Sequence, residues 1–419
     1  MPHATAAESR PLLRSRNAVL VIATAAVAVN LRPGITTVGP ELDTVTRNFG
    51  AGSAAGGVIT ALPVVAFAVV SLATPALLAR ISVRAGLYAA LAIIAVSLAV
   101  RPWGGLPLFV LATFASAIGI GLLSALLPVV VRSSGSTGML VTTFTTALQA
   151  GAALGFAAIV PLSNAVHSWQ WGLTLWALLA PIGMFALWAA PGAAARPVAA
   201  TPTSAAATPK PGAATAQLPS APAEHTTVNP LTILRRTRTI WLALFFGLQA
   251  LVAFVVIGWL PSILVDDAGV GPQAAGGYLG LMTCLGVPIS LIVPPFVARS
   301  AHPARWLAGF SACTVLGVLA LLVAPRAAPL LWVLVLGIGL SVFSLVLTVL
   351  TVRASTAEQA AGLSSSVQGV GYVIAAVGPY AIGLFRHLSA GWALPLGALL
   401  ATAVLQLLAA FAIGRGRSA

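Results

Sequence analysis

Long apolar stretches, separated by short polar or charged gaps, recur along almost the whole sequence. Each is close to the ~20 residues that an α-helix needs to cross the hydrocarbon core of a bilayer. We therefore predict an all-α integral membrane protein with twelve transmembrane helices. They are expected near residues 17–39, 54–78, 85–101, 105–131, 138–165, 169–190, 239–264, 273–297, 305–324, 328–352, 358–385 and 390–413.

The gap between the sixth and seventh stretches is rich in Ala, Pro and Thr. Such a segment buries too little apolar surface to offset the entropy of ordering it. We therefore predict a six-helix bundle over residues 1–191, a cytoplasmic low-complexity linker over 192–238 and a second six-helix bundle over 239–419. The last part of the linker, residues 230–238, carries three arginines. It either lies along the membrane surface or provides stop-transfer charge.

The two predicted bundles share a sequence register. Gln149 and Gln368 are 219 residues apart, as are Pro75 and Pro294, which begin two similar proline-to-arginine segments. Gly-Ile-Gly motifs at 119–121 and 337–339 show nearly the same displacement. This constant spacing indicates two pseudo-symmetric halves, which is a known plan of secondary transporters.

The composition excludes a water-soluble protein, because 59% of the residues are hydrophobic and only 7% are charged. Soluble domains carry about 25% charged residues. A net charge of +14 in a soluble chain would suggest nucleic acid, but here the cations lie in gaps between apolar stretches. We therefore expect no nucleic-acid partner. The partners predicted are the lipid bilayer and a small-molecule substrate, and the chain is expected to be monomeric.

The distribution of the 21 cations predicts the orientation. With a cytoplasmic N-terminus, sixteen lie on the inner side, Arg47, Arg101, Arg326 and Arg386 lie outside, and Arg32 lies within a crossing. The positive-inside rule therefore predicts a multi-pass protein with both termini cytoplasmic. Arginine in place of lysine, with abundant alanine, is typical of a high-GC bacterium, so the location expected is the bacterial inner membrane.

Catalytic motifs are absent from the sequence. The single lysine, Lys210, lies between two prolines and does not follow a phosphate-binding glycine loop, and no hydrolase motif is present. Cys284 and Cys313 lie in apolar stretches without the spacing of a metal site. We predict that the protein is not an enzyme and holds no cofactor or metal, so a gradient must drive its transport.

The chain resembles the major facilitator superfamily over essentially its whole length. The loop of residues 78–86 is similar to the superfamily's loop between helices two and three, although it lacks the usual Asp. The segment NLRPGITTVGP at 30–40, with Ala-Leu-Pro at 61–63, GWLP at 258–261 and QGVGY at 368–372, resembles the cyanate and 2-nitroimidazole porter family. This resemblance implies a secondary carrier with a central cavity between its halves.

Arg32 is the candidate that points most directly to a substrate. A charge at this depth costs several kcal/mol unless it is paired or hydrated, and no Asp or Glu falls inside a predicted crossing, since Glu358 only begins one at its cytoplasmic end. We therefore predict that its donor fork faces the cavity and binds an anionic or strongly polarised solute. Anchoring at the headgroups or at Glu41 or Asp43 is the alternative. Pro33 and Gly34 are expected to break the helix there and to act in gating.

Other polar residues are assigned around this cation. Gly258 and Pro261 are expected to disturb helix seven as Pro33 and Gly34 disturb helix one. Trp259 either stacks on a planar substrate or belongs to the interfacial belt, and Gln249 either binds substrate or makes an interhelical hydrogen bond. Asn30 is assigned to orient Arg32. Gln368 is assigned to the cavity because Tyr372 lies one helical turn further on, whereas Gln149 is interpreted as an interhelical contact.

These residues predict a secondary active transporter that moves a small anionic or polarised planar solute by alternating access. Glu41 and Asp43 are the candidates for proton coupling, while uniport and exchange remain open. One alternative function is efflux of neutral drug-like compounds such as nitroheterocycles. An alternative of another class is a non-transporting membrane sensor.

Overall fold

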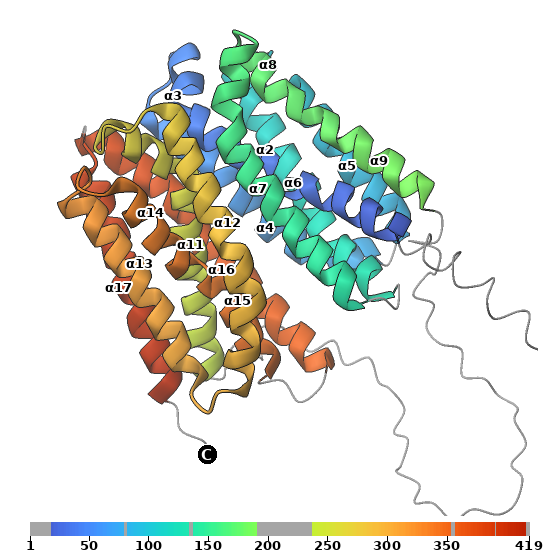
Figure 1. Cartoon of the computed structure of the whole chain (residues 1–419), viewed down its shortest axis with the longest axis vertical. Helices are drawn as coiled ribbons and strands as arrows, with labels where there is room; N and C mark the ends of the chain where they lie inside the picture. The colour runs from blue at the N-terminus through green and yellow to red at the C-terminus, as the bar shows by residue number, and fades with distance from the viewer. Residues whose placement is uncertain are drawn as a thin grey trace, which may run out of the picture.

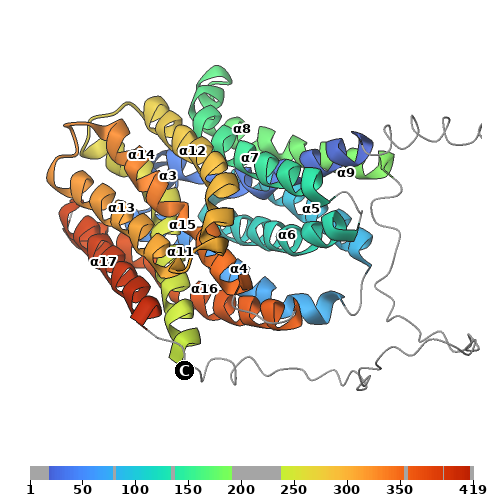
Figure 2. The same ribbon diagram turned by 60° about the horizontal axis from the view of Figure 1, so that its bottom comes forward.

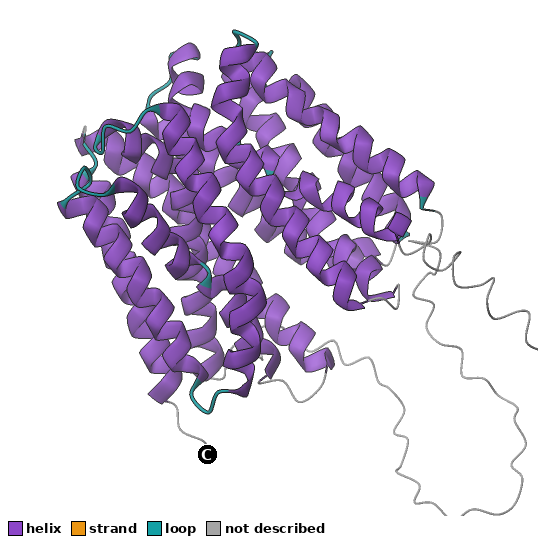
Figure 3. Ribbon diagram, viewed as in Figure 1, coloured by secondary structure: helices purple, strands orange, loops and turns teal. Residues whose placement is uncertain are grey.

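A computed structural model of the chain describes residues 18–78, 82–133, 137–190, 237–352, 357–389 and 391–415. In these ranges every regular element is a helix, and the connections are short (Figure 3). Twelve helices are long and apolar enough to cross a membrane. The predicted all-α, twelve-helix membrane fold is therefore confirmed. The predicted linker lies outside the described residues, except for residues 237–238, which begin a helix.

The first six crossings run through residues 18–189. The first crossing is helical from residue 18 and then divides into three short pieces, η1 (Val29–Leu31), α2 (Pro33–Thr36) and α3 (Val38–Asn48). The others are α4 (Ser53–Leu78), α5 (Val83–Val100), α6 (Gly105–Ser133), α7 (Thr137–Ala165) and the sixth crossing, which consists of α8 (Trp169–Thr174), η2 (Leu175–Leu178) and α9 (Leu179–Ala189).

The last six crossings are largely unbroken helices. They are α11 (Thr237–Asp266), α12 (Pro272–Arg299), α13 (Pro303–Val323), the pair α14 (Pro329–Leu340) and α15 (Val342–Val352), α16 (Ala357–Ser389) and α17 (Ala393–Arg415). Three of these helices begin with a proline, which suits the first helical position because the missing N–H has no intrahelical partner there.

Two features near the predicted outer ends were not foreseen. The first apolar span covers Ala18–Thr36, close to the predicted 17–39, but the chain then continues as the helix α3 to Asn48. Pro40 does not end it, because it is the third residue of α3, where a helix has no use for an N–H donor. Glu41 and Asp43 therefore lie on a helix and not in a loop. Arg101 was counted among the outer loop cations, but its side chain is fully buried.

The helices form two groups that meet at one end. In Figure 1 the first six crossings, blue to green, lie on one side and the last six, yellow to red, on the other; the groups approach near α3, α8 and α12 and diverge away from them. Helix α4 packs along α16, and α7 along α12; the first of these pairs is also side by side in Figure 2. We call the end at which α3 contacts α11 the closed end.

Glycines allow the backbones to touch at the closed end. A Cβ on Gly39 of α3 would collide with the carbonyl oxygen of Ile257 in α11, and a Cβ on Gly383 of α16 would lie 2.6 Å from the Cα of Gly57 in α4. Between α3, α4, α6 and α11 remains a cavity of about 10 Å³. Such a volume holds about one water molecule, so the space between these helices is too small for a solute.

Candidate substrate site

Arg32 lies at the break in the first crossing. Its φ of −127° and ψ of −39° fall outside the helical range, and it ends η1 directly before Pro33 begins α2. A proline disfavours the helical conformation of the preceding residue, which explains the break. The Arg32 side chain is only partly buried. Among the described residues, no hydrogen bond or ion pair engages its guanidinium.

Tyr372 of α16, which comes from the opposite half, is the titratable group that interacts electrostatically with Arg32. Its ring contacts Phe67 of α4 and Phe246 and Phe254 of α11, with centroid distances of 6.0, 5.4 and 6.5 Å. Phe343 of α15 joins through Phe246 at 5.6 Å. We call these five residues the ring cluster. It spans both halves, and its Phe67, Phe343 and Tyr372 rings are partly exposed.

The arrangement of Arg32 and the ring cluster suits a flat, electron-rich solute. A guanidinium presents its N–H donors in one plane, which matches carboxylate-like or nitro-like oxygens. Aromatic rings add edge or face contacts to a planar ligand. Gln368, one turn before Tyr372 on α16, is partly exposed as well. The structure thus brings Arg32 and Tyr372 together and leaves Gln368 on the same helix as Tyr372.

Asn30 is placed differently from its predicted role. Its side-chain amide donates to the carbonyl of Ala26 at 2.9 Å and to that of Leu179 at 3.1 Å, and the residue is 3% exposed. The second bond joins the first crossing to α9 within the same half. Asn30 therefore fastens the helix next to Arg32, and within the described residues no hydrogen bond runs from the Arg32 guanidinium to the Asn30 amide oxygen.

Gln249 makes contacts between helices of its own half. It is fully buried, donates to the carbonyl of Leu340 at 3.0 Å and accepts a hydrogen bond from Gln406 at 2.7 Å; Gln406 also donates to Ser311 at 3.1 Å. Leu340 is the last residue of α14, where the tenth crossing is interrupted. Gln249 therefore donates its hydrogen bond to a carbonyl at a helix break. This placement favours the interhelical alternative over a substrate contact.

Trp259 belongs to the packing of the closed end. It is 2% exposed, its indole N–H donates to the carbonyl of Pro379 at 3.1 Å, and its ring meets Trp392 edge-on at 5.7 Å. Substrate stacking and the interfacial belt both require an accessible ring, so neither assignment describes this conformation. Gly258 packs against Thr60 of α4.

The seventh crossing is not broken at Gly258 and Pro261 as predicted, because α11 is continuous through both. Pro261 only deprives the Ile257 carbonyl of its usual N–H donor. This carbonyl is the one that faces Gly39 across the two halves.

Glu41 and Asp43 have different surroundings on α3. The Asp43 carboxyl lies near the Ser262 hydroxyl of α11, in the other half, which favours its charged form. Burial raises the pKa of Asp43, with a further increase from Asp266 and opposing effects of Ser262, Arg47 and Arg386. Burial also raises the pKa of Glu41, which lies beside Ser163 and Thr44 of its own half and is 5% exposed. Of the two, Asp43 is the carboxylate that bridges the halves.

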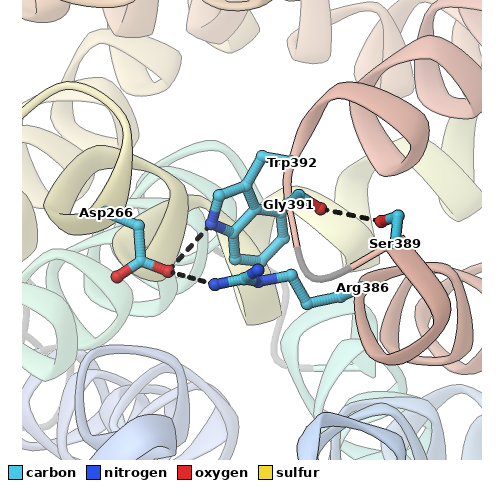
Figure 4. Close-up of polar contacts among 5 residues, drawn as sticks. All are labelled: Asp266, Arg386, Ser389, Gly391 and Trp392. Carbon is cyan, nitrogen blue, oxygen red and sulfur yellow. Dashed lines mark hydrogen bonds and ion pairs between the residues drawn. The ribbon is translucent and has the colours of Figure 1, made fainter.

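Near Asp43, Asp266 joins the ends of α11, α16 and α17. Its carboxylate accepts hydrogen bonds from Arg386 at 3.0 Å and from the indole N–H of Trp392 at 2.9 Å, and the Arg386 guanidinium lies 4.9 Å from the Trp392 ring (Figure 4). The pair is partly exposed, with 24% and 38% of the side chains accessible. Partly exposed ion pairs of this kind contribute little to stability. The main effect of the Asp266–Arg386 pair is therefore to place charged groups at the closed end.

Arg101 is the site residue that sequence reasoning missed. Its guanidinium donates to the carbonyl of Gly34 at 2.9 Å and to the hydroxyl of Thr37 at 3.4 Å, and it lies 5.4 Å from the Phe109 ring. Burial lowers the pKa of Arg101 to about 10, so it remains charged at neutral pH. The sequence signal was present but ambiguous, because an arginine ending an apolar stretch is usually a loop charge.

No grouping of three His, Cys, Asp or Glu side chains that would suit a metal ion occurs in the described ranges. What the geometry presents is a candidate site between two helical halves that are packed together at one end. A model of the Major Facilitator Superfamily matches residues 21–379. The chain belongs to this superfamily. It is therefore a membrane-embedded transporter of small solutes.

Two curated relatives of this major facilitator are transporters of Escherichia coli K12. The 2-nitroimidazole transporter is 31% identical over 97% of this chain and 97% of its own length. The cyanate transport protein CynX is 28% identical over 87% of this chain and 89% of its own length. Among solved structures, the nucleoside transporter NupG is 14% identical and superposes with a TM-score of 0.71, covering 95% of this chain and 98% of that one. The predicted resemblance to the cyanate and 2-nitroimidazole porters is thereby confirmed.

Proposed function

We propose that this major facilitator moves a small anionic or strongly polarised planar solute by alternating access between residues 1–191 and 239–419. The observation that carries the proposal is Arg32, a partly exposed guanidinium at a helix break that has no carboxylate partner among the described residues. Its neighbour across the halves is the tyrosine of an aromatic cluster. In this proposal Arg32 and Tyr372 bind the solute, with Gln368 at the same level of α16.

The energetic reason is the cost of an uncompensated charge within a membrane protein, which is several kcal/mol. An anionic or nitro-bearing solute supplies the missing acceptors and is bound more strongly than a neutral aliphatic one. Since both halves contribute groups to the site, binding also couples the two halves, as alternating access requires.

The names of the relatives support this class of solute. Cyanate is a small anion, and 2-nitroimidazole is a flat ring with a strongly polarised substituent. A second candidate, efflux of neutral nitroheterocycles, is favoured by the ring cluster, because such compounds bind rings through stacking without requiring a full charge.

We further propose that the protein lies in a bacterial cytoplasmic membrane with both termini cytoplasmic, so that the closed end faces outwards. Proton coupling is assigned to Asp43, whose carboxylate contacts the other half, with Glu41 as the second candidate. A pH gradient imposed across proteoliposomes distinguishes proton coupling from uniport or exchange.

The test uses purified protein and two probes, cyanate and 2-nitroimidazole. Ligand-induced thermal stabilisation and proteoliposome uptake are measured for the parent, Arg32→Gln, Arg32→Lys and the control Arg415→Gln, which changes an exposed cation in the last turn of α17. We expect the ligand to raise the unfolding temperature of the parent and the control by mass action. Both Arg32 variants should lose at least about tenfold in affinity, because lysine lacks the planar fork.

Undiminished binding by Arg32→Gln would remove the proposal. If cyanate does not bind and 2-nitroimidazole binding survives Arg32→Gln but is lost in Tyr372→Ala, the neutral-efflux candidate replaces it.

A further inference from the structure

Arg101 is fully buried and has no carboxylate partner among the described residues. Its Nε has no hydrogen-bond partner either. A guanidinium held in this way costs free energy that its other contacts must offset. The groups that the Arg101 guanidinium contacts therefore indicate its role in the structure.

Both hydrogen-bond acceptors of Arg101 belong to the break in the first crossing. The Gly34 carbonyl lies in α2, and the Thr37 hydroxyl lies at the turn between α2 and α3. Arg101 itself follows α5, so the contacts join two crossings of the same half. The Phe109 ring of α6 lies beside the guanidinium and completes its surroundings.

The break lacks hydrogen bonds that an intact helix would have. Pro33 and Pro40 have no N–H, so the carbonyls four residues before them, those of Val29 and Thr36, have no intrahelical donor. The hydroxyls of Thr36 and Thr37 donate to the carbonyls of Arg32 at 3.1 Å and Pro33 at 2.6 Å. Arg101 adds the donors that come from outside this segment, and it binds close to both ends of α2.

We propose that Arg101 is a positioning residue for the substrate site, which holds the break in the first crossing so that the Arg32 side chain stays directed towards the other half. Arg101 does not touch the solute. A displacement of ~1 Å in a binding group is enough to weaken its function strongly, and Arg32 is only two residues from the carbonyl that Arg101 binds.

The first experiment does not depend on any substrate. Hydrogen exchange of the amides of residues 34–39 is compared in the parent, Arg101→Gln, Arg101→Lys and Arg415→Gln. We expect exchange in this segment to rise at least about tenfold in Arg101→Gln, less in Arg101→Lys, and not in the control, while α13 and α17 keep their protection.

The second experiment measures the direction of position 32. Arg32→Cys is made in a background in which Cys284 and Cys313 are replaced by serine, and the rate of labelling by a water-soluble maleimide is measured with and without Arg101→Gln. A change of about threefold or more is expected, with partial recovery in Arg101→Lys. Unchanged labelling together with unchanged exchange at 34–39 overturns the proposal. Exchange that rises equally in all helices also overturns it, because it indicates a merely structural role.

A transport readout rests on the proposed function. With cyanate as the probe, Arg101→Gln should raise KM about tenfold in proteoliposomes and leave the maximal rate within about twofold. If the parent protein takes up neither cyanate nor 2-nitroimidazole, the proposed function fails. The hydrogen-exchange and labelling results still test whether Arg101 is a positioning residue.

Discussion

At the scale of single residues, two arginines near one helix break differ in what they contact. The Arg32 guanidinium has no hydrogen-bond partner within the described residues, and the Arg101 guanidinium is bound to the break itself. The position of Arg32 inside an apolar stretch made it recognisable from the sequence. The burial of Arg101 was not predictable, because it depends on Gly34 and Thr37, which only the packing of the first and third crossings brings to it.

The residue-scale prediction concerns pH and Asp43. Because burial raises its pKa above the ordinary value of 3.8 in this conformation, the protonated carboxyl favours the closed end. As the pH rises through the raised pKa, the buried group must take up charge, and the closed end loses stability. We expect maleimide labelling of Thr113→Cys, a buried reporter beside the small cavity at the closed end, to rise more steeply than ionisation of the cysteine thiol alone accounts for, as the pH passes through the raised pKa of Asp43.

In Asp43→Asn the additional pH dependence should largely disappear, which leaves the slope set by ionisation of the reporter thiol. Glu41→Gln is the matched control, since Glu41 also has a raised pKa but lies beside groups of its own half. The same slope in Asp43→Asn as in the parent would exclude Asp43 as the titrating group.

At the scale of elements, similar sequence signals had different outcomes in helices one and seven. Both contain glycine and proline, yet the first crossing is divided at Arg32 and Thr37, and α11 is continuous through Pro261. At its break the first crossing has additional donors in Thr36, Thr37 and Arg101, which bind the carbonyls of Arg32, Pro33 and Gly34. Proline alone therefore does not decide whether a helix breaks.

The element-scale prediction is that Gly39→Ala prevents the closed end from forming. Its Cβ would collide with the Ile257 carbonyl, and backbone atoms cannot move aside as a side-chain tip can. We expect uptake to fall at least about tenfold and labelling of Thr113→Cys to rise, while the protein still inserts and folds. Gly277→Ala on α12, where a Cβ meets nothing within 4 Å, should behave like the parent. Normal uptake by Gly39→Ala would show that the two halves do not need this contact.

At the scale of the whole molecule, the even number of crossings places both termini on one side, and the arginine distribution predicts which side that is. Asn48 and Ala301 are exposed residues at opposite ends of the helices. In intact cells, we expect a membrane-impermeant maleimide to label Asn48→Cys, and to label Ala301→Cys only after permeabilisation. The reverse pattern would invert the proposed orientation and place the closed end inside.

The sequence by itself determined the twelve crossings and the membrane class, because bilayer thickness and the need to satisfy backbone hydrogen bonds act on local runs of residues. It also indicated the break at Pro33. Only the tertiary structure decided which polar side chains face one another. Gln249 lies in an amide network, Trp259 in the closed end and Tyr372 beside Arg32. The physical reason is that the direction of a side chain follows from the packing of helices far apart in the chain, which local composition does not encode.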